Sequence, residues 1–165
     1  MENTILSHQQ IQHKIRRIAY QILESNVSED EIILAGITGG GMEFAKRLAK
    51  VLSDISDATI TLGEVSMDKK NPLQSGVTTN LSPETYTNKP LVLVDDVLNS
   101  GSTLIYGVHH FLQVPLLRLK TAVLVNRNHK KYPVKADFKG ISLSTSLHEH
   151  VEVVFSEGND KVLLE

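Results

Sequence analysis

Cysteine is absent from the 165-residue sequence. Its absence excludes disulfide bonds, thiolate nucleophiles and metal sites built from cysteine, so any catalysis must use oxygen and nitrogen groups. Long apolar runs are also missing, and none approaches the roughly 20 residues that a membrane span requires. The first residues, MENT, lack the basic and apolar regions of a secretory signal. We therefore expect a cytoplasmic protein without a membrane segment.

Neither sign of charge dominates the sequence. The formal net charge is -2 and the pI is near 6.4, which do not suggest nonspecific binding to nucleic acid. A local basic patch can still exist within such an average. With 165 residues, 41% of them hydrophobic, the chain is long enough for one domain with a sizeable core and too short for two ordinary domains. We therefore expect a single domain spanning residues 1–165.

The stretch most indicative of function is residues 91–103, with the sequence LVLVDDVLNSGST. Its four leading apolar residues predict a buried parallel strand, at whose end stand Asp95 and Asp96. In open α/β sheets, ligands bind outside the carboxyl ends of the strands. Carboxylates only accept hydrogen bonds, so this pair favours a ligand rich in donors, such as two vicinal sugar hydroxyls.

A small, hydroxyl-rich turn at residues 99–103 leads from this strand into a predicted helix. Backbone N–H groups at a helix start attract anions, and Gly101 lets the backbone come close to a ligand. The serine and threonine hydroxyls add further donors. The turn therefore favours a terminal phosphate, and together with the carboxylate pair it indicates a ribose 5-phosphate.

Three other interpretations of this stretch compete. The carboxylates could bind Mg²⁺ in a phosphate-transfer protein, but the chain has no G-x-x-x-x-G-K-[ST] loop. A receiver domain would carry such acidic residues on its first strand, whereas here about ninety residues of other structure come before them. Acidic residues that merely end a strand would leave the turn at 99–103 unexplained.

A second glycine-rich turn, Thr38-Gly39-Gly40-Gly41, lies between a predicted strand at residues 31–37 and a predicted helix. Successive glycines allow several backbone N–H groups to point at a polyanion. The spacing lacks the G-x-G-x-x-G dinucleotide fingerprint, and no acid clearly ends the next strand. We therefore interpret this turn as a second phosphate loop.

Residues 66–88 follow the next predicted strand and show little apolar periodicity. A stretch of this length inside a compact domain is usually a functional lid or a disordered excursion. Its Lys69 and Lys70 could close on a leaving pyrophosphate, or they could simply be solvated.

The remaining pattern predicts an amphipathic helix at residues 8–25, a core strand at 119–125 and a late strand at 151–155 that ends the domain. Strands and helices thus alternate as β-α-β units, which favours a mainly parallel sheet. Five histidines lack the spacing of metal ligands on one element, which argues against a zinc site; they are His109, His110, His129, His148 and His150.

The run at residues 92–103 resembles the phosphoribosyl-diphosphate signature of type I phosphoribosyltransferases. Segments over nearly the whole chain are similar to one branch, the bifunctional pyrimidine-operon attenuator and uracil phosphoribosyltransferase, above all residues 122–130 and 137–140. The resemblance implies a single α/β domain with a twisted, mainly parallel sheet flanked by helices. It also implies a lid at about 66–88, a small hood from about 127–150 and the N-terminal segment, Mg²⁺, and a homodimer or higher oligomer.

The resemblance assigns roles residue by residue. Asp95 and Asp96 would hold the ribose hydroxyls. The lid of this branch usually holds a Tyr-Arg pair, and here Lys69 and Lys70 are the lysines available to assist catalysis. Mg²⁺ would be bound mainly through the substrate, with Asp95 as the candidate protein ligand. Two groups of small residues would bind the anions: Asn99, Ser100, Gly101, Ser102 and Thr103 the 5-phosphate, and Thr38, Gly39, Gly40 and Gly41 the pyrophosphate.

The base is assigned less directly. Lys135 would face an exocyclic oxygen of the base, expected to be uracil, and Phe138 would pack near its ring. Hypoxanthine and guanine enzymes carry an aspartate where this chain has Asn99, although an amide can also hydrogen-bond a ring nitrogen, so a purine enzyme is an alternative. Gly39 and Gly40 replace the basic or bulkier residues usual in this branch, which keeps a ligand-binding homologue with little catalysis as another alternative.

An alternative from a different class is a regulator that senses uridine nucleotides and binds RNA. Phosphate contacts of this kind make affinity fall steeply with salt. The basic residues of such a surface would be Arg16, Arg17, Arg127, His129 and Lys130.

Overall fold

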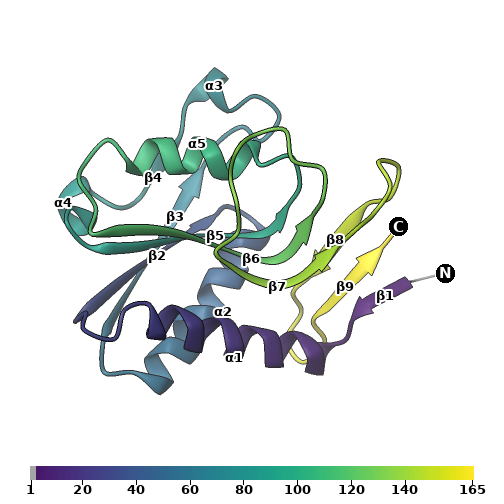
Figure 1. The fold of residues 1–165 in the computed structure, drawn as a ribbon, viewed down its shortest axis with the longest axis horizontal. Helices are drawn as coiled ribbons and strands as arrows, with labels where there is room; N and C mark the ends of the chain where they lie inside the picture. The colour runs from purple at the N-terminus through teal and green to yellow at the C-terminus, as the bar shows by residue number, and fades with distance from the viewer. Residues whose placement is uncertain (1–2) are drawn as a thin grey trace.

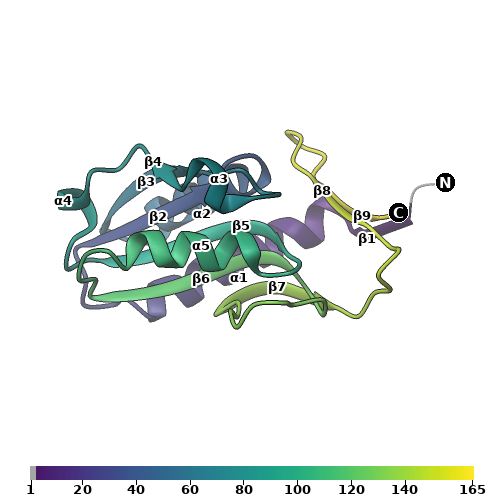
Figure 2. The ribbon, with the colours of Figure 1, turned by 90° about the horizontal axis from the view of Figure 1, so that it is seen from above.

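The computed structural model describes residues 3–165, which form an α/β architecture with helices on both faces of a mixed central sheet (Figures 1 and 2). The strands are β1 (Asn3–Leu6), β2 (Glu31–Ile37), β3 (Thr59–Ser66), β4 (Thr78–Thr79), β5 (Pro90–Leu98), β6 (Arg118–Arg127), β7 (Phe138–Leu143), β8 (Val151–Val154) and β9 (Lys161–Leu164). The helices are α1 (His8–Glu24), α2 (Gly40–Ile55), α3 (Pro72–Ser75), α4 (Pro83–Tyr86) and α5 (Ser102–Phe111). Within residues 3–165, no helix has the length and apolar character needed to cross a membrane.

The central sheet has six strands in the order β4-β3-β2-β5-β6-β7, and all neighbours are parallel except β3 and β4. Strand β2 pairs with β3 on one side and with β5 on the other, so the strand order reverses there. In open α/β sheets, such a reversal leaves a crevice at the carboxyl ends of the two strands. The segments that follow β2 and β5 are the two glycine turns, at residues 38–41 and 99–103.

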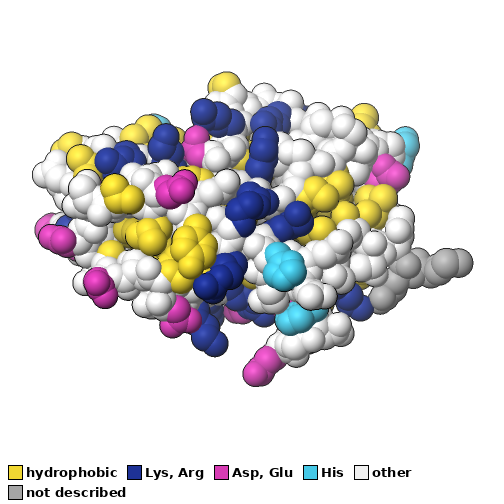
Figure 3. Space-filling view, turned by 60° about the horizontal axis from the view of Figure 1, so that its bottom comes forward, with side chains coloured by type: hydrophobic (Ala, Val, Ile, Leu, Met, Phe, Trp, Pro, Cys, Tyr) yellow, Lys and Arg dark blue, Asp and Glu magenta, His cyan; other side chains and the backbone are white. Residues whose placement is uncertain are grey.

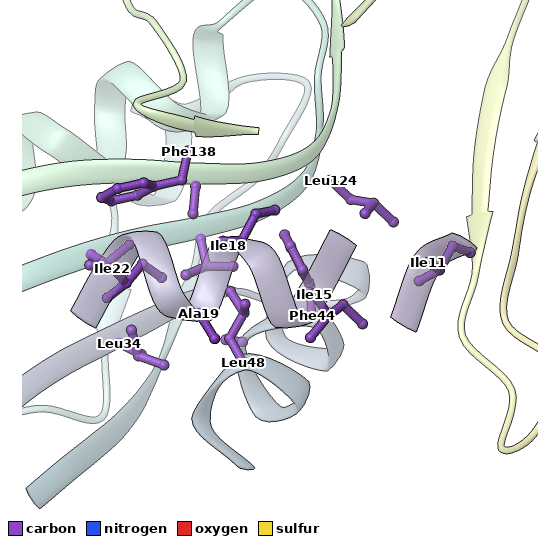
Figure 4. Close-up of a cluster of buried hydrophobic side chains, with 14 of the residues drawn as sticks. Ile11, Ile15, Ile18, Ala19, Ile22, Leu34, Phe44, Leu48, Leu124 and Phe138 are labelled. Atoms are coloured by element: carbon purple, nitrogen blue, oxygen red, sulfur yellow. The ribbon is translucent and has the colours of Figure 1, made fainter. Parts of the chain in front are cut away.

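Two hydrophobic cores hold the helices against this sheet. Helices α1 and α2 cover one face, where their apolar side chains meet those of β2, β5, β6 and β7 (Figure 4). Helices α4 and α5 cover the other face, and α3 packs against α5. Successive strand residues point to opposite faces, so the neighbours Ile33 and Leu34 belong to different cores. Burial on both faces explains the apolar run at residues 91–94.

Helix α1 begins at a capping box. Ser7 Oγ accepts the backbone N–H of Gln10 at 3.3 Å, and Gln10 Oε1 accepts the backbone N–H of Ser7 at 2.9 Å. Isoleucines three or four positions apart then form one buried stripe; they are Ile11, Ile15, Ile18 and Ile22. The observed bounds confirm the predicted helix at residues 8–25 to within one residue.

A second sheet, in the order β1-β9-β8, joins the N-terminal strand to the end of the chain. Asp160, which is 2% exposed, fastens this sheet to both helices of the nearby face. It accepts hydrogen bonds from Arg47 of α2 at 3.0 and 3.2 Å and from Gln12 of α1 at 2.8 Å. Burial acts to raise the pKa of Asp160, but these hydrogen bonds outweigh burial and lower it. An ionised carboxylate therefore anchors the small sheet.

The small sheet departs from the hood that the sequence predicts. Residues 138–143, expected in the hood, instead form β7 and pair with β6, because Phe138 packs in the core against α1. The predicted strand at 151–155 exists as β8, but it belongs to the small sheet rather than to the central one. The small sheet therefore takes its strands from residues 3–6 and 151–164.

The segment at residues 66–88 contains more regular structure than its sequence predicts. Strand β4 pairs with the end of β3, and the Asn80 side chain accepts the backbone N–H of Glu64 at 2.9 Å. Leu81 packs directly over Gly63 of β3. The second half of the segment is thus attached to the sheet, and the exposed excursion narrows to about residues 67–76, around α3 at the top of Figure 1.

Candidate functional site

A cleft of about 380 Å³ lies at the carboxyl edge of the central sheet. Its lining comes from the end of β5 and the following turn, from the exposed excursion and from the start of β8. These residues are Asp95, Asp96, Val97, Asn99, Ser100, Ser102, Thr103, Lys69, His150, Val151, Glu152 and Val153. The fold thus brings the two carboxylates, the hydroxyl-rich turn and one lysine of the expected lid to a single hollow.

The two carboxylates at the end of β5 differ in their surroundings. Asp95 is 5% exposed, whereas Asp96 is half-buried. Asp95 Oδ1 accepts the backbone N–H of Asp96 at 2.9 Å, and Asp96 Oδ1 accepts that of Val97 at 2.9 Å. Burial raises the pKa of Asp95 well above its usual range, and the neighbouring charge of Asp96 raises it further. The pair therefore offers one half-buried carboxylate and one buried carboxyl group that holds its proton unusually tightly.

The turn after β5 is shaped to expose backbone N–H groups. Gly101 has a φ of 88°, in the left-handed region that favours glycine, and it stands immediately before α5. Gly101 provides no side-chain cap, and Ser100 Oγ accepts the backbone N–H of Ser102, the first residue of α5, at 3.2 Å. A small hollow lined by Asp95 and residues 97–104 lies at this point. Backbone N–H groups at a helix start with a hollow beside them form an arrangement that binds a phosphate.

The turn after β2 adjoins the same cleft. Helix α2 begins at Gly40 without a side-chain cap, and a Cβ placed on Gly40 would lie 2.1 Å from Asp96 Oδ2. A Cβ on Gly39 would lie 3.8 Å from Lys69 Nζ. Thr38 differs from the predicted role, because its backbone N–H and hydroxyl both bond the carbonyl oxygen of Val65. Thr38 therefore fixes the loop to β3, while Gly40 and Gly41 pack against Asp96 and Asp95.

Three residues assigned to the site by sequence lie away from the cleft. Lys70 is exposed, and its backbone N–H bonds Asp68. The Lys135 side chain is 82% exposed and lies 3.6 Å from Asp137. Phe138 points into the core beside Ile22 of α1 (Figure 4). Lys135 and Phe138 are therefore corrected from base contacts to a surface ion pair and a core residue, because β7 runs along the edge of the central sheet.

The candidate RNA-binding residues divide into exposed and internal ones. Arg16, Arg17 and Lys130 are exposed, and Figure 3 shows a band of Lys and Arg side chains across the face near α1. Arg127, in contrast, is only 7% exposed, and His129 Nε2 lies 3.2 Å from Thr145 Oγ1. Arg127 is thus removed from the RNA-binding candidates, since its guanidinium is bonded inside the protein.

Sequence reasoning missed the wall of the cleft formed by His150, Val151, Glu152 and Val153. Strand β8 reaches the cleft only because the small sheet folds beside α1 and α2, a contact between residues far apart in the chain. The available signal was the polar pair at His150 and Glu152, two positions apart at the start of a predicted strand.

Comparison with known proteins places this geometry in a family. The phosphoribosyl transferase domain matches residues 1–158. The chain belongs to this family. Bifunctional protein PyrR of Haemophilus ducreyi is 33% identical over 163 residues, covering 93% of this chain and 89% of the relative. Bifunctional protein PyrR of Streptococcus agalactiae is 34% identical over 152 residues, covering 90% and 88%.

Solved phosphoribosyltransferases share the fold. A hypoxanthine-guanine phosphoribosyltransferase of Bacillus anthracis has a TM-score of 0.73 and 24% identity, covering 86% of this chain and 81% of that chain. Hypoxanthine phosphoribosyltransferase of Trypanosoma cruzi, in complex with its product IMP, has a TM-score of 0.78 and 18% identity, covering 99% and 95%. At these identities the similarity establishes the phosphoribosyltransferase fold and leaves the base open.

The donor set of the cleft fits Mg²⁺ that is bound mainly through a substrate. Within residues 3–165, no group of three or more His, Cys, Asp or Glu side chains could hold a metal ion. The cleft nevertheless carries oxygen ligands at Asp95 and Asp96. Mg²⁺ is usually bound through one or two carboxylates together with substrate phosphates, so a complete protein cage is not required.

Proposed function

We propose that the protein transfers ribose 5-phosphate from 5-phosphoribosyl 1-diphosphate to a nitrogen of uracil and releases pyrophosphate. The observation that carries this proposal is that a carboxylate pair and a hydroxyl-rich turn at a helix start line one cleft, with Gly40 at the start of α2 packed against Asp96. In this arrangement Asp95 and Asp96 hold the ribose hydroxyls, the turn at residues 99–103 holds the 5-phosphate, and the loop at residues 38–41 holds the pyrophosphate.

The chemistry follows from the charges around the sugar. A base nitrogen forms a bond to C1 while the bond from C1 to the pyrophosphate oxygen breaks, and the proton of the base nitrogen passes to solvent. Positive charge that develops on the sugar ring is stabilised by the nearby carboxylates. Lys69 and the N–H groups at the start of α2 stabilise the charge on the leaving pyrophosphate. Bound Mg²⁺, with Asp95 and Asp96 as candidate ligands, would neutralise part of the diphosphate charge.

Uracil is proposed as the base on two grounds. Residues 122–130 and 137–140 are similar to the attenuator and uracil branch, and the relatives at 33% and 34% identity bear the name Bifunctional protein PyrR. The structure adds that Asn99 Oδ1 accepts a hydrogen bond from Arg127 Nη1 at 3.0 Å. The amide oxygen thus accepts one hydrogen bond inside the protein, while the NH₂ group of Asn99 can donate either to a carbonyl oxygen of uracil or to a purine ring nitrogen.

A panel of bases tests this proposal. The protein would be incubated with 5-phosphoribosyl 1-diphosphate, Mg²⁺ and one of uracil, hypoxanthine, guanine, xanthine or orotate, and each nucleotide would be separated by chromatography. We expect uridine 5′-monophosphate to form fastest. Faster formation of a purine nucleotide would show that the preferred base is a purine and not uracil. The absence of any nucleotide would support a ligand-binding homologue.

A second function, RNA binding governed by uridine nucleotides, is favoured by the basic band in Figure 3. The exposed candidates Arg16 and Arg17 lie on α1, with Lys130 in the segment after β6. Leader RNA would be titrated with and without uridine 5′-monophosphate at two salt concentrations, and affinity should fall at the higher one. RNA affinity that does not change with the nucleotide would contradict the regulatory role.

The proposed homodimer or higher oligomer would be tested by light scattering during gel filtration.

A further inference from the structure

Arg127, the last residue of β6, joins two separate segments that line the cleft. Its Nη1 donates to Asn99 Oδ1 at 3.0 Å, at the start of the turn after β5. Its Nε and Nη2 donate to Thr145 Oγ1 at 3.0 and 2.7 Å. Nη2 also donates to the carbonyl oxygens of Ser146 at 3.3 Å and Glu149 at 2.7 Å. One buried side chain thus makes five hydrogen bonds across two segments.

The segment held on the far side of Arg127 leads directly into β8. Residues 145–149 precede His150 and Val151, which line the cleft. A further bond supports this connection, since Asn128 Oδ1 accepts the backbone N–H of Thr145 at 3.2 Å. The separation between the turn at residues 99–103 and the wall formed by β8 therefore depends on the Arg127 guanidinium.

The charge of Arg127 has no acidic partner among residues 3–165. Each of its hydrogen bonds ends on a neutral oxygen, of an amide, a hydroxyl or a carbonyl group. The observed ion pairs involve other basic residues. A buried cation is normally paired with an anion, because an uncompensated charge is costly in the interior. The adjoining turn is the place where the proposed function puts a phosphate.

We propose that Arg127 is a positioning residue whose buried charge is compensated by the phosphate of the substrate. Its planar guanidinium holds Asn99 and the segment before β8 at a fixed separation, and its charge strengthens phosphate binding at the turn. This inference rests on the proposed function, because the sugar phosphate supplies the missing anion. Arg127, which the sequence alone suggests is an exposed basic residue, thereby becomes a determinant of substrate affinity.

The test uses two substitutions at Arg127 and one at the opposite end of the same strand. Arg127→Met removes the charge, and Arg127→Lys keeps the charge but loses the planar fork. Arg118→Met is the matched control, since Arg118 starts β6 and bonds Asn26 away from the cleft. Binding of ribose 5-phosphate would be measured by titration calorimetry at a temperature where circular dichroism shows each variant folded.

Arg127→Met should weaken ribose 5-phosphate binding roughly tenfold or more, the size expected for losing a charge-assisted hydrogen bond. Arg127→Lys should lose less, and Arg118→Met should bind like the wild type. A purely structural role would lower the melting temperature of both Arg127 variants without this order of affinities. If Arg127→Met does not fold, the affinity of Arg127→Lys for ribose 5-phosphate is compared with that of the wild type. We expect Arg127→Lys to bind more weakly, and equal affinities would overturn the inference.

Each result has a defined meaning. If the wild type binds ribose 5-phosphate and a folded Arg127 variant binds it equally well, this inference is overturned and the proposed function stays intact. Failure of the wild type to bind ribose 5-phosphate would contradict both. The order wild type, Arg127→Lys, Arg127→Met, with Arg118→Met unchanged, would support the inference.

Discussion

A Cβ atom on Gly40 would lie 2.1 Å from Asp96 Oδ2, a separation that no packed pair of atoms tolerates. The loop after β2 and the carboxylate at the end of β5 can approach this closely only because residue 40 has no side chain. This contact gives Gly40 a physical role. It sets the distance between the proposed pyrophosphate loop and the proposed ribose ligand.

Gly40→Ala should therefore impair catalysis by displacing Asp96. We expect kcat/KM to fall roughly tenfold or more, because small misplacements of reacting groups are expensive. A double-mutant cycle with Asp96→Ala identifies the cause: Gly40→Ala should add little in the Asp96→Ala background, where the clash is gone. Fully additive losses would show that the two residues act independently.

Lys69→Met and Lys70→Met form a matched pair of adjacent substitutions. Both lysines are exposed, but Lys69 lines the cleft next to Gly39, whereas Lys70 does not line it. Lys69→Met should raise the KM for 5-phosphoribosyl 1-diphosphate by about tenfold, as expected for a charge-assisted contact to the pyrophosphate. Lys70→Met should have a much smaller effect. Equal effects in steady-state kinetics would contradict the placement of Lys69.

Asp95→Asn should make the protein more stable while it loses activity. Burial, and then the charge of Asp96, raises the pKa of Asp95, so folding favours the protonated carboxyl. The Asp95 carboxyl therefore contributes fully to stability below the ordinary aspartate pKa of about 3.9. This contribution is lost as the pH rises through the raised pKa of Asp95 in the folded protein. The amide stays neutral throughout. Urea denaturation should show that Asp95→Asn is more stable than the wild type at pH 7 and that the difference shrinks toward pH 4. A variant less stable than the wild type at pH 7 would contradict this prediction.

Asp160→Ala should detach the small sheet from α1 and α2. Removing Asp160 takes away the buried partner of Arg47 and leaves it only the more exposed Glu43, so we expect a loss of roughly 2–4 kcal/mol in the free energy of unfolding. The pKa of Asp160 is lowered, so its contribution is present above the ordinary aspartate value and is lost as the pH falls through the lowered one. Asp54→Ala, at an exposed position on α2, is the control. A loss no larger than that of the control at neutral pH would contradict the anchoring role.

The local pattern of residues 91–103 was sufficient to predict a buried strand, a carboxylate pair and an exposed turn. Each of these depends on neighbours in sequence: apolar residues buried on both faces of β5, and Gly101 in the left-handed region. Helix α1 was predictable for the same reason, since its cap and its isoleucine stripe are local. Features of this kind follow from short-range physical chemistry.

Roles that depend on distant contacts were not predictable. Arg127 stands among basic residues in the sequence, and only the fold brings it to Asn99 and Thr145. Phe138 could face a base or a core until the pairing of β7 with β6 fixes its direction. The wall at residues 150–153 requires the small sheet to reach the cleft. Spacing along the chain carries no record of these neighbours.

The most direct test of the central claim follows uridine 5′-monophosphate and pyrophosphate together. The wild type and the Asp95→Asn, Asp96→Asn double variant would each receive uracil, 5-phosphoribosyl 1-diphosphate and Mg²⁺, after circular dichroism confirms that both are folded. We predict that the wild type forms the two products in equal amounts and that the double variant forms neither. Product formation at the wild-type rate by the double variant would contradict the assignment of the cleft as the catalytic site.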